Sequence, residues 1–220
     1  MNIKAVKNRI RLVFEKKEPE TNLKEICRLF PFQTVNALFS FLYGTDTSIR
    51  WQAVSAMGEA VNALAERDLE ASRVVMRRLM WNLNEESGGI GWGSPEAFGE
   101  ICARNAVLAS EYAKILISYI DPHQNFIENP LLQQGILWGI SRIAHVRPHV
   151  VREAPGHLVR FLESSDPNLR GVAVFAASAF HDPRTDPFLE ALSEDSAEIV
   201  IFMEQRLQIR KISSLASRLI

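Results

Sequence analysis

Four glutamates flank a glycine-rich stretch in the middle of the sequence, where several carboxylates lie close enough together to do chemistry. They are Glu85, Glu86, Glu96 and Glu100, within the segment WNLNEESGGIGWGSPEAFGEI of residues 81–101. Paired carboxylates can act as general acid and base or can bind a divalent cation. The segment contains no histidine and no aspartate, so a catalytic or metal site is the less favoured interpretation.

The glycines between these glutamates indicate a shaped loop over residues 84–93. Positive φ angles and a close approach of backbone amides are accessible to Gly88, Gly89, Gly91 and Gly93. A phosphate-binding loop normally follows a strand and carries a lysine or arginine, whereas this loop follows a helical pattern and carries glutamates. We therefore expect Ile90 and Trp92 to dock on the surrounding helices, either as an internal plug or as part of a binding site.

The histidines and cysteines form no recognisable metal-binding or redox motif. His145 and His149 have the four-residue spacing of helical metal ligands, but Pro148 lies between them and marks the end of a helix. Cys27 and Cys102 are far apart in the sequence, so we expect two buried free thiols in a reducing compartment, and hence a cytoplasmic protein. No metal and no cofactor is predicted.

The elements that must position these residues are helices, because apolar residues recur at helical spacing and no convincing alternating run indicates a strand. One pattern occurs twice, in DTSIRWQAVSAMG from Asp46 and in DPNLRGVAVFAAS from Asp166. Both segments read Asp-x-x-aliphatic-Arg-x-x-Ala-x-x-Ala, with Arg50 and Arg170 at the arginine position. Weaker copies begin at Ser94 and Asn129, and a poor one lies near Asp195.

Each part of this pattern has a physical role. Asp, Ser or Asn caps the free amides of a new helix, and proline is well tolerated in its first turn. Small residues at three-residue spacing let the helix pack closely against its neighbours. Another helical pattern precedes each copy, so the unit is a helical hairpin of roughly 35–40 residues, stacked on the next one.

This repeat resembles HEAT-type repeats, including the short bacterial kind first noted in bilin lyases. The resemblance extends over about residues 30–205 and implies an α-α superhelix whose second helices line the concave face. In that family the repeats bind other macromolecules and carry no catalytic residues. The resemblance also implies a structural role for Arg50 with Asp46 and for Arg170 with Asp166, in which each arginine bonds to a neighbouring unit through a loop aspartate.

The predicted fold is therefore all-α, a superhelix of about four to five stacked helical hairpins without a sheet. Residues 1–20 are expected to form an amphipathic helix that caps the array. Residues 21–220 are expected to form the repeat domain, with the glycine-rich loop of residues 84–93 inserted in it.

Charge and hydropathy limit the class of partner. The formal net charge is -1, whereas general nucleic-acid binders carry a basic excess, so nucleic acid is not the expected partner. No segment approaches the roughly 20 consecutive apolar residues that a membrane span requires. A protein partner is the prediction that remains.

We interpret the chain as a non-enzymatic protein-binding module that uses its concave face and the 84–93 loop. Tryptophan is enriched at interaction hot spots, and all four tryptophans lie on predicted second helices or beside the loop. The candidate binding residues are Trp51, Arg77, Trp81, Glu85, Glu86, Trp92, Glu96 and Trp138. The alternative is an enzyme, or a protein that binds a small ligand or DNA, with its site around Glu85, Glu86 and Trp92.

Overall fold

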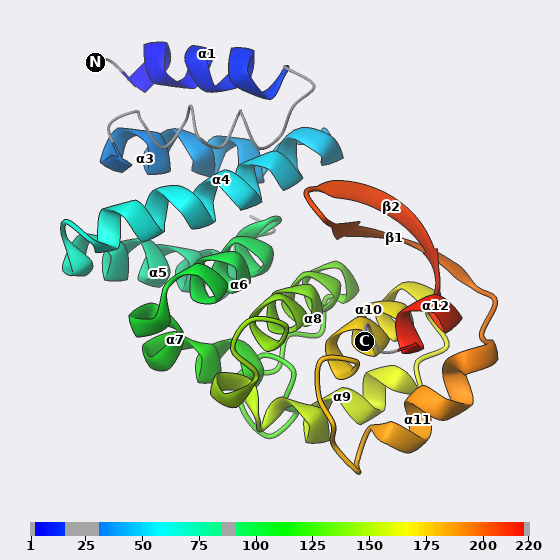
Figure 1. Cartoon of the computed structure of the whole chain (residues 1–220). Coiled ribbons are helices and arrows are strands. Elements are labelled where there is room, and N and C mark those ends of the chain that lie inside the picture. Colours follow the sequence, from blue (N-terminus) through cyan, green and yellow to red (C-terminus); the bar gives the residue numbers. More distant parts are fainter. Residues whose placement is uncertain (1–2, 16–30, 85–90, 218–220) are drawn as a thin grey trace.

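Paired helices follow one another along the chain and stack side by side into a curved array, as Figure 1 shows. The computed structural model describes residues 3–15, 31–84 and 91–217. In chain order, the helical elements up to the end of the fourth hairpin are α1 (Ile3–Phe14), α3 (Pro31–Leu42), α4 (Thr47–Ala65), α5 (Leu69–Asn84), α6 (Ser94–Arg104), α7 (Ala106–Ser118), α8 (Pro130–Ala144), the 3-10 turn η1 (Pro148–Val151), α9 (Ala154–Leu162) and α10 (Pro167–Ala177). The all-α repeat fold predicted from the sequence is confirmed.

The helices form two rows. The inner row consists of α4, α6, α8 and α10, each of which packs against the next, while α3, α5, α7 and α9 form the outer row. Each inner helix pairs with the outer helix that precedes it, which gives four stacked hairpins. The apolar side chains between the rows form one continuous core.

Side-chain caps begin three of the four inner helices, as the sequence predicts. The carboxylate of Asp46 accepts the amide of Ile49 at 3.0 Å, and Asn129 and Asp166 cap α8 and α10 in the same manner. Ser94 is the exception, because it is the first residue of α6 and makes no capping bond. The cap position belongs to Gly93, whose φ of 74° favours glycine.

Two glycines allow the closest approach between inner helices. A Cβ placed on Gly99 of α6 would lie 2.2 Å from the Cα of Gly139 in α8. The two backbones therefore touch at this crossing, which only residues without side chains permit. This contact fixes the spacing of α6 and α8 and hence the positions of the residues that they carry.

The expectation of a chain without strands is wrong at its C-terminal end. Residues expected to form a fifth capped helix near Asp195 form instead an antiparallel hairpin of β1 (Glu198–Met203) and β2 (Arg206–Lys211), with Val200 opposite Ile209. Glu204 and Gln205 make the two-residue turn with positive φ angles of 49° and 61°, the geometry of tight hairpins.

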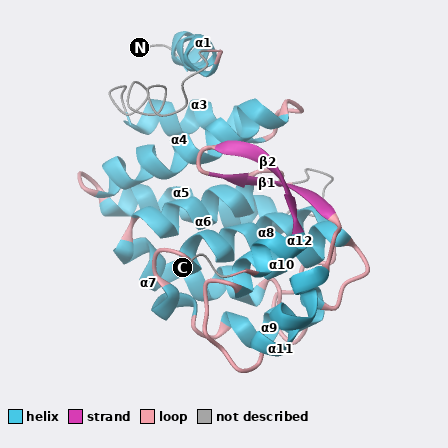
Figure 2. Ribbon diagram, turned by 45° about the vertical axis from the view of Figure 1, so that its right-hand side comes forward, coloured by secondary structure: helices cyan, strands magenta, loops and turns pink. Residues whose placement is uncertain are grey.

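The hairpin lies on the inner side of the array. It follows α11 (Asp186–Ala191) and the 3-10 turn η2 (Leu192–Glu194), and α12 (Ile212–Ala216) then packs against α10 as a short fifth inner helix. From there the two strands extend back across the inner helices to contact α4 (Figures 1 and 2). A segment near the end of the chain thus covers part of the concave face.

The amphipathic helix expected at the start of the chain corresponds to α1. Val6, Ile10, Val13 and Phe14 are buried, and α1 packs against α3. Phe14 meets Phe41 of α3 edge to face, with ring centroids 5.4 Å apart. The apolar side of α1 therefore covers the first face of the array.

Candidate functional site

A cavity of about 570 Å³ lies between the inner helices and the C-terminal hairpin. We call it the hairpin cavity. Its walls come from α4, α6, α8, α10 and both strands, so they bring together residues of all four helical hairpins and of the C-terminal strands. Leu131 and Val200 line it and are 56% and 60% exposed, so the cavity opens to solvent. This size and position are typical of ligand-binding sites.

Three aromatic rings form its apolar wall. Trp51 of α4 and Phe202 of β1 stack with their centroids 4.7 Å apart and an interplanar angle of 8°. Trp138 of α8 meets Trp51 edge to face at 4.7 Å, and its indole N–H donates to the carbonyl oxygen of Phe202 at 2.9 Å. The inner helices and the hairpin are therefore joined at the cavity itself, and the aromatic wall is held in place from both sides.

The carboxyl group of Glu96 is the main polar group of the cavity. It lies against the backbone of Gly135 in α8, where a Cβ would come within 2.7 Å of the Glu96 Cδ. Its Oε2 atom is buried and has no hydrogen-bond partner. Burial raises the pKa of Glu96 above its ordinary value, although the positive charge of Arg50 opposes this shift.

Trp92 supplies a second buried polar atom without a partner. Its ring packs partly buried against the core and lines the cavity, and its Nε1 atom makes no hydrogen bond. The neighbouring Gly93 sets its position, because the Gly93 backbone lies against Leu42 of α3: a Cβ there would be 2.9 Å from the Leu42 carbonyl oxygen. The end of the 84–93 loop is thus anchored where Trp92 meets the cavity.

The two repeat arginines occupy equivalent sequence positions but have different surroundings. Arg170 donates to Asp195 Oδ2 at 2.8 Å and to the carbonyl oxygen of Ser164 at 2.6 Å, so it ties α10 to the following unit. Arg50 departs from the expected structural role. It lines the hairpin cavity, and its side chain makes no hydrogen bond or ion pair within the part of the chain that the structure describes.

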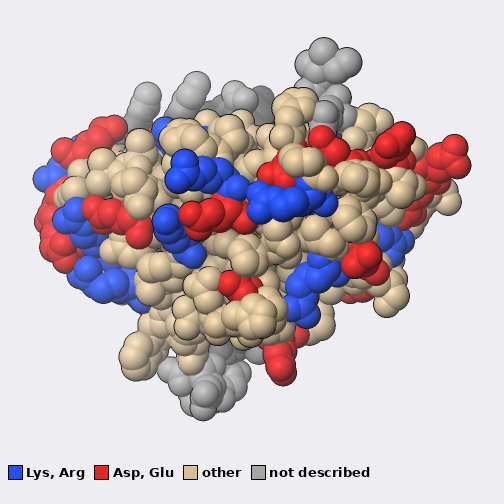
Figure 3. Space-filling view, turned by 90° about the horizontal axis from the view of Figure 1, so that it is seen from below, with Lys and Arg blue, Asp and Glu red and all other residues tan. Residues whose placement is uncertain are grey.

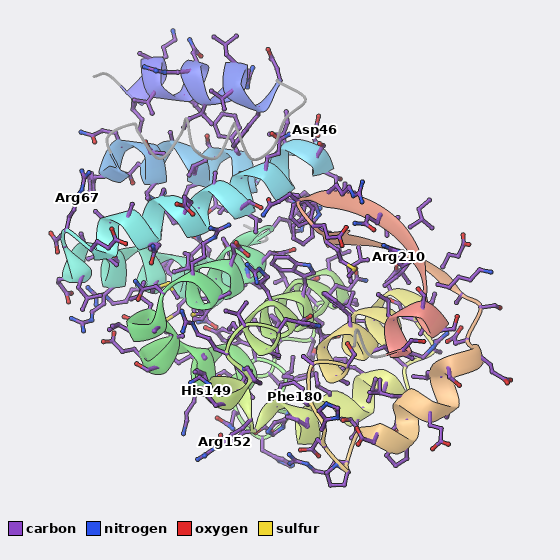
Figure 4. All side chains as sticks on the ribbon, viewed as in Figure 1. Asp46, Arg67, His149, Arg152, Phe180 and Arg210 are labelled. Atoms are coloured by element: carbon purple, nitrogen blue, oxygen red, sulfur yellow. The ribbon has the colours of Figure 1, made fainter. Side chains whose placement is uncertain are left out.

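Asp46 and Asp166 do not pair with the arginines of their own repeats. Each carboxylate accepts backbone amides at the start of its own helix, at 3.0 Å for Asp46 and 2.8 Å for Asp166. Figure 4 labels Asp46 at the beginning of α4, the end of that helix nearest to the tip of the hairpin. The two carboxylates therefore have the capping role that the sequence predicts. They are not the partners of Arg50 and Arg170 that the resemblance implies.

A charged network continues the inner surface beyond the cavity. Glu100 of α6 is almost fully buried, and it accepts from Arg104 and from Arg142 of α8, both at 2.6 Å. Arg104 also pairs with Glu59 of α4. Two carboxylates and two guanidinium groups satisfy one another across three helices, so Glu100 has a structural role.

The candidate residues predicted from the sequence separate into two groups. Trp51, Trp92, Glu96 and Trp138 all line the hairpin cavity. Arg77 and Trp81 lie on the outer helix α5, where Arg77 pairs with Glu70 at 2.7 Å and Trp81 is 70% exposed.

Some of the loop predictions lie outside the described residues. They concern Glu85, Glu86, Ile90 and the path of residues 85–90. The plug and the binding site therefore both remain possible interpretations of that loop. In the described part of the chain, no three His, Cys, Asp or Glu side chains are grouped as metal ligands would be.

Phe202 and its strand neighbours are the site residues that sequence reasoning missed. Leu207 and Ile209 alternate with Arg206, Gln208 and Arg210, which is the two-residue period of a half-buried strand. This signal is present but short. No sequence pattern connects β1 with Trp51, about 150 positions earlier, so their contact follows only from the fold.

Comparison with known proteins identifies one sequence relative and several structures of similar fold. No family model matches the chain. A curated protein of Archaeoglobus fulgidus, described as an uncharacterized protein, is 28% identical over 184 residues, which are 81% of this chain and 91% of that protein. This similarity shows that the sequence has a relative over most of its length.

Designed and engineered proteins are among the structures of similar fold. A designed armadillo repeat protein in complex with the peptide (KR)4 has a TM-score of 0.54 at 14% identity, over 96% of each chain. Computationally designed armadillo repeat proteins for modular peptide recognition give 0.52 at 14% identity, over 99% of this chain and 98% of the other. An engineered protein gives 0.55 at 13% identity, over 99% and 95%.

At such identities the likeness concerns the fold alone. The chain has the fold of an armadillo- or HEAT-like helical-repeat solenoid. The narrower resemblance to the bilin-lyase type stays a prediction. None of the described helices is long and apolar enough to cross a lipid bilayer.

Proposed function

We propose that this chain is a non-enzymatic protein-binding module that holds a segment of a partner protein in the hairpin cavity. The observation that carries this proposal is the cavity's composition, which combines an aromatic wall with buried polar atoms that have no hydrogen-bond partner among the described residues. Binding sites typically combine apolar walls with a few polar groups that fix the orientation of the ligand. Two of the structural neighbours are described as recognising peptides, which supports a peptide segment as the ligand.

The charge distribution also favours a protein partner over nucleic acid. Acidic and basic side chains are interspersed over the face shown in Figure 3, and the formal net charge is -1. A nucleic-acid surface would concentrate lysines and arginines to neutralise phosphates. Two arginines of the inner surface, Arg104 and Arg142, instead pair with Glu100.

The test is selection of 12-residue peptides on the immobilised chain, with the peptides displayed on a carrier protein in two formats, either with both ends embedded or with a free C-terminus. Peptides that bind in the cavity should lose binding to the variant Leu131→Glu, which places a charge at the cavity wall. Val107→Glu is the matched control, because Val107 is likewise exposed and is the second residue of an asparagine-capped helix, but on the outer row. Equal loss in both variants, or no enrichment above the carrier, would contradict the proposal.

A small organic molecule is the second candidate ligand, and the cavity volume is the observation that favours it. A volume of about 570 Å³ lies in the range typical of small-molecule sites. A metabolite panel followed by thermal shift and tryptophan fluorescence separates the two candidates. A compound that raises the melting temperature of the wild type but not of Leu131→Glu would favour the small ligand, while short duplex DNA serves as a negative control.

A further inference from the structure

Within the described part of the chain, three polar groups of the hairpin cavity have no hydrogen-bond partner. They are the indole N–H of Trp92, the carboxyl Oε2 of Glu96 and the guanidinium of Arg50, whose charge acts on Glu96 without a hydrogen bond between them. Nearly all buried polar groups in proteins are hydrogen-bonded, so two unpartnered buried atoms in one cavity call for an explanation. A ligand that supplies the missing bonds would account for both atoms.

The chemistry of the three groups restricts that ligand. Arginine and the indole nitrogen can only donate hydrogen bonds, so the ligand must present acceptors to them. Glu96 as a carboxylate only accepts, so the ligand must also present a donor. The groups come from α4, α6 and the residue before the α6 cap, and all three line the same cavity.

We infer that the hairpin cavity binds the free C-terminal end of a partner polypeptide, an inference that rests on the proposed function. The terminal carboxylate accepts from Arg50 and Trp92, since guanidinium and carboxylate match in geometry as well as in charge. The amide N–H of the terminal residue lies a few bonds away and donates to Glu96. One chain end therefore supplies all three missing hydrogen bonds.

Other charged ligands leave one of the three groups unsatisfied. An ammonium group would bind Glu96, but it would meet the like charge of Arg50 and leave the Trp92 N–H without an acceptor. A phosphate dianion would bind Arg50, but it has no hydrogen to donate to Glu96. An internal peptide segment offers N–H and C=O groups but no charge to pair with Arg50.

The apolar wall gives the site a preference for the terminal side chain. Trp51, Trp138 and Leu207 surround the space beside the polar groups, and Leu131 and Val172 extend it. An apolar side chain placed there would remove its surface from water, which is favourable. We therefore expect the bound end to carry an aliphatic or aromatic last residue.

The experiment compares two combinatorial libraries of N-acetylated tetrapeptides that differ only at the C-terminus. One library ends in a free carboxylate and the other in a carboxamide, and binding to the full-length chain is followed by tryptophan fluorescence and thermal shift. We expect the carboxylate peptides to bind at least about tenfold more tightly, because a hydrogen bond between charged groups is lost in the carboxamide. The best carboxylate peptides should end in an apolar residue.

Variants of the cavity make the test specific. In Arg50→Gln the preference for carboxylate over carboxamide should disappear, and this ratio does not depend on how much of the variant is folded. Trp92→Phe keeps an aromatic ring without the N–H and should weaken carboxylate binding alone. Arg67→Gln is the matched control, since Arg67 is an exposed arginine in the turn that follows α4, away from the cavity (Figure 4).

Equal affinity for both libraries in the wild type would overturn the inference, and so would failure of every carboxylate peptide to bind. A carboxylate preference that persists in Arg50→Gln would also overturn it. The proposed function is tested by the separate selection of 12-residue peptides. Embedded peptides that bind the wild type but not Leu131→Glu would support the proposed function even if the carboxylate preference is absent. A failure of the inference can therefore be distinguished from a failure of the proposed function.

Discussion

The rings of Trp51 and Phe202 lie parallel, with centroids 4.7 Å apart, although the two residues are about 150 positions apart in the sequence. Trp51 lies in α4, the second helix of the first repeat unit. Phe202 lies in β1 of the hairpin, which follows α11 and η2. In a simple solenoid each repeat contacts only its neighbours. This stack instead joins distant units and forms a wall of the hairpin cavity.

Phe202→Ala should destabilise the chain by about 3 kcal/mol, because it removes a buried aromatic ring and leaves a space beside Trp51 and Trp138. Urea denaturation followed by circular dichroism measures the change. Val200→Ala, on the same strand but 60% exposed, should cost much less. A similar loss in both variants would show that the ring contact contributes nothing specific.

Arg170→Ala and Arg50→Ala should differ in stability although they alter the same repeat position. Arg170 donates partly buried hydrogen bonds to Asp195 and to the carbonyl oxygen of Ser164. Its replacement should therefore lower the free energy of unfolding by about 1–3 kcal/mol. Arg50 makes no such hydrogen bonds in the described residues and acts on Glu96 only through its charge, so its replacement should cost less than that of Arg170. Denaturation of the two variants in parallel gives the comparison, and equal losses would refute it.

Gly99→Ala should cost more than about 2 kcal/mol, because the added methyl group would overlap the backbone of Gly139. Gly156→Ala is the control within another helix, where the new methyl would meet only the flexible end of Arg184. Helix propensity predicts that this control is neutral or slightly stabilising. Thermal melts of both variants test the tight crossing of α6 and α8, and an unchanged Gly99→Ala would contradict it.

Glu96→Gln should stabilise the unbound chain at neutral pH by about 1–3 kcal/mol, since it removes a carboxylate whose buried Oε2 atom has no hydrogen-bond partner. Burial raises the pKa of Glu96 above its ordinary value. At a pH between the pKa of the unfolded state and that of the folded state, Glu96 is therefore protonated in the folded chain and ionised in the unfolded chain. The contribution of Glu96 to stability is therefore full below the unfolded pKa and is lost as the pH rises through the folded pKa.

The measurement is the difference in unfolding free energy between Glu96→Gln and the wild type as a function of pH. The difference should be small near pH 4 and should grow towards pH 7, because all other titrating groups are common to the two proteins. A difference that is constant over this range would show that the Glu96 carboxyl does not titrate abnormally. The same variant should bind carboxylate peptides more weakly if Glu96 accepts from the ligand.

The repeat array could be predicted from the sequence because its signals are local. The caps at Asp46, Asn129 and Asp166 are confirmed, and so is the stacking of helical hairpins around small residues. A cap and a helical period depend on residues within one or two turns of one another. Such patterns can be recognised without knowledge of the distant contacts.

The hairpin of β1 and β2 could not be predicted from the sequence in this way, because its local signals are weak. The residues of β1 form a short apolar run that suits a strand or a buried helix equally well. Its turn is Glu204–Gln205, whereas turns with two positive φ angles usually carry asparagine, aspartate or glycine. The helical repeat before it made a further helix the natural expectation.

The candidate site depends on contacts between distant segments. Trp51, Trp92 and Trp138 could be selected as candidates by residue type, but their meeting beside Phe202 follows from the path of the whole array. The resemblance to HEAT-type repeats also implied the same structural role for Arg50 as for Arg170. The two differ because Asp195 follows α10 in the array, whereas Arg50 faces the cavity.

The position of the hairpin in the chain has a consequence for protein synthesis. A ribosome completes α4, α6 and α8 long before it reaches Glu198, so the nascent chain displays the inner surface without its last wall. A product cut short by a premature stop before that residue would keep most of its helices and lack the cavity. Ligand binding would thus distinguish finished copies of the protein from incomplete ones, even where both fold.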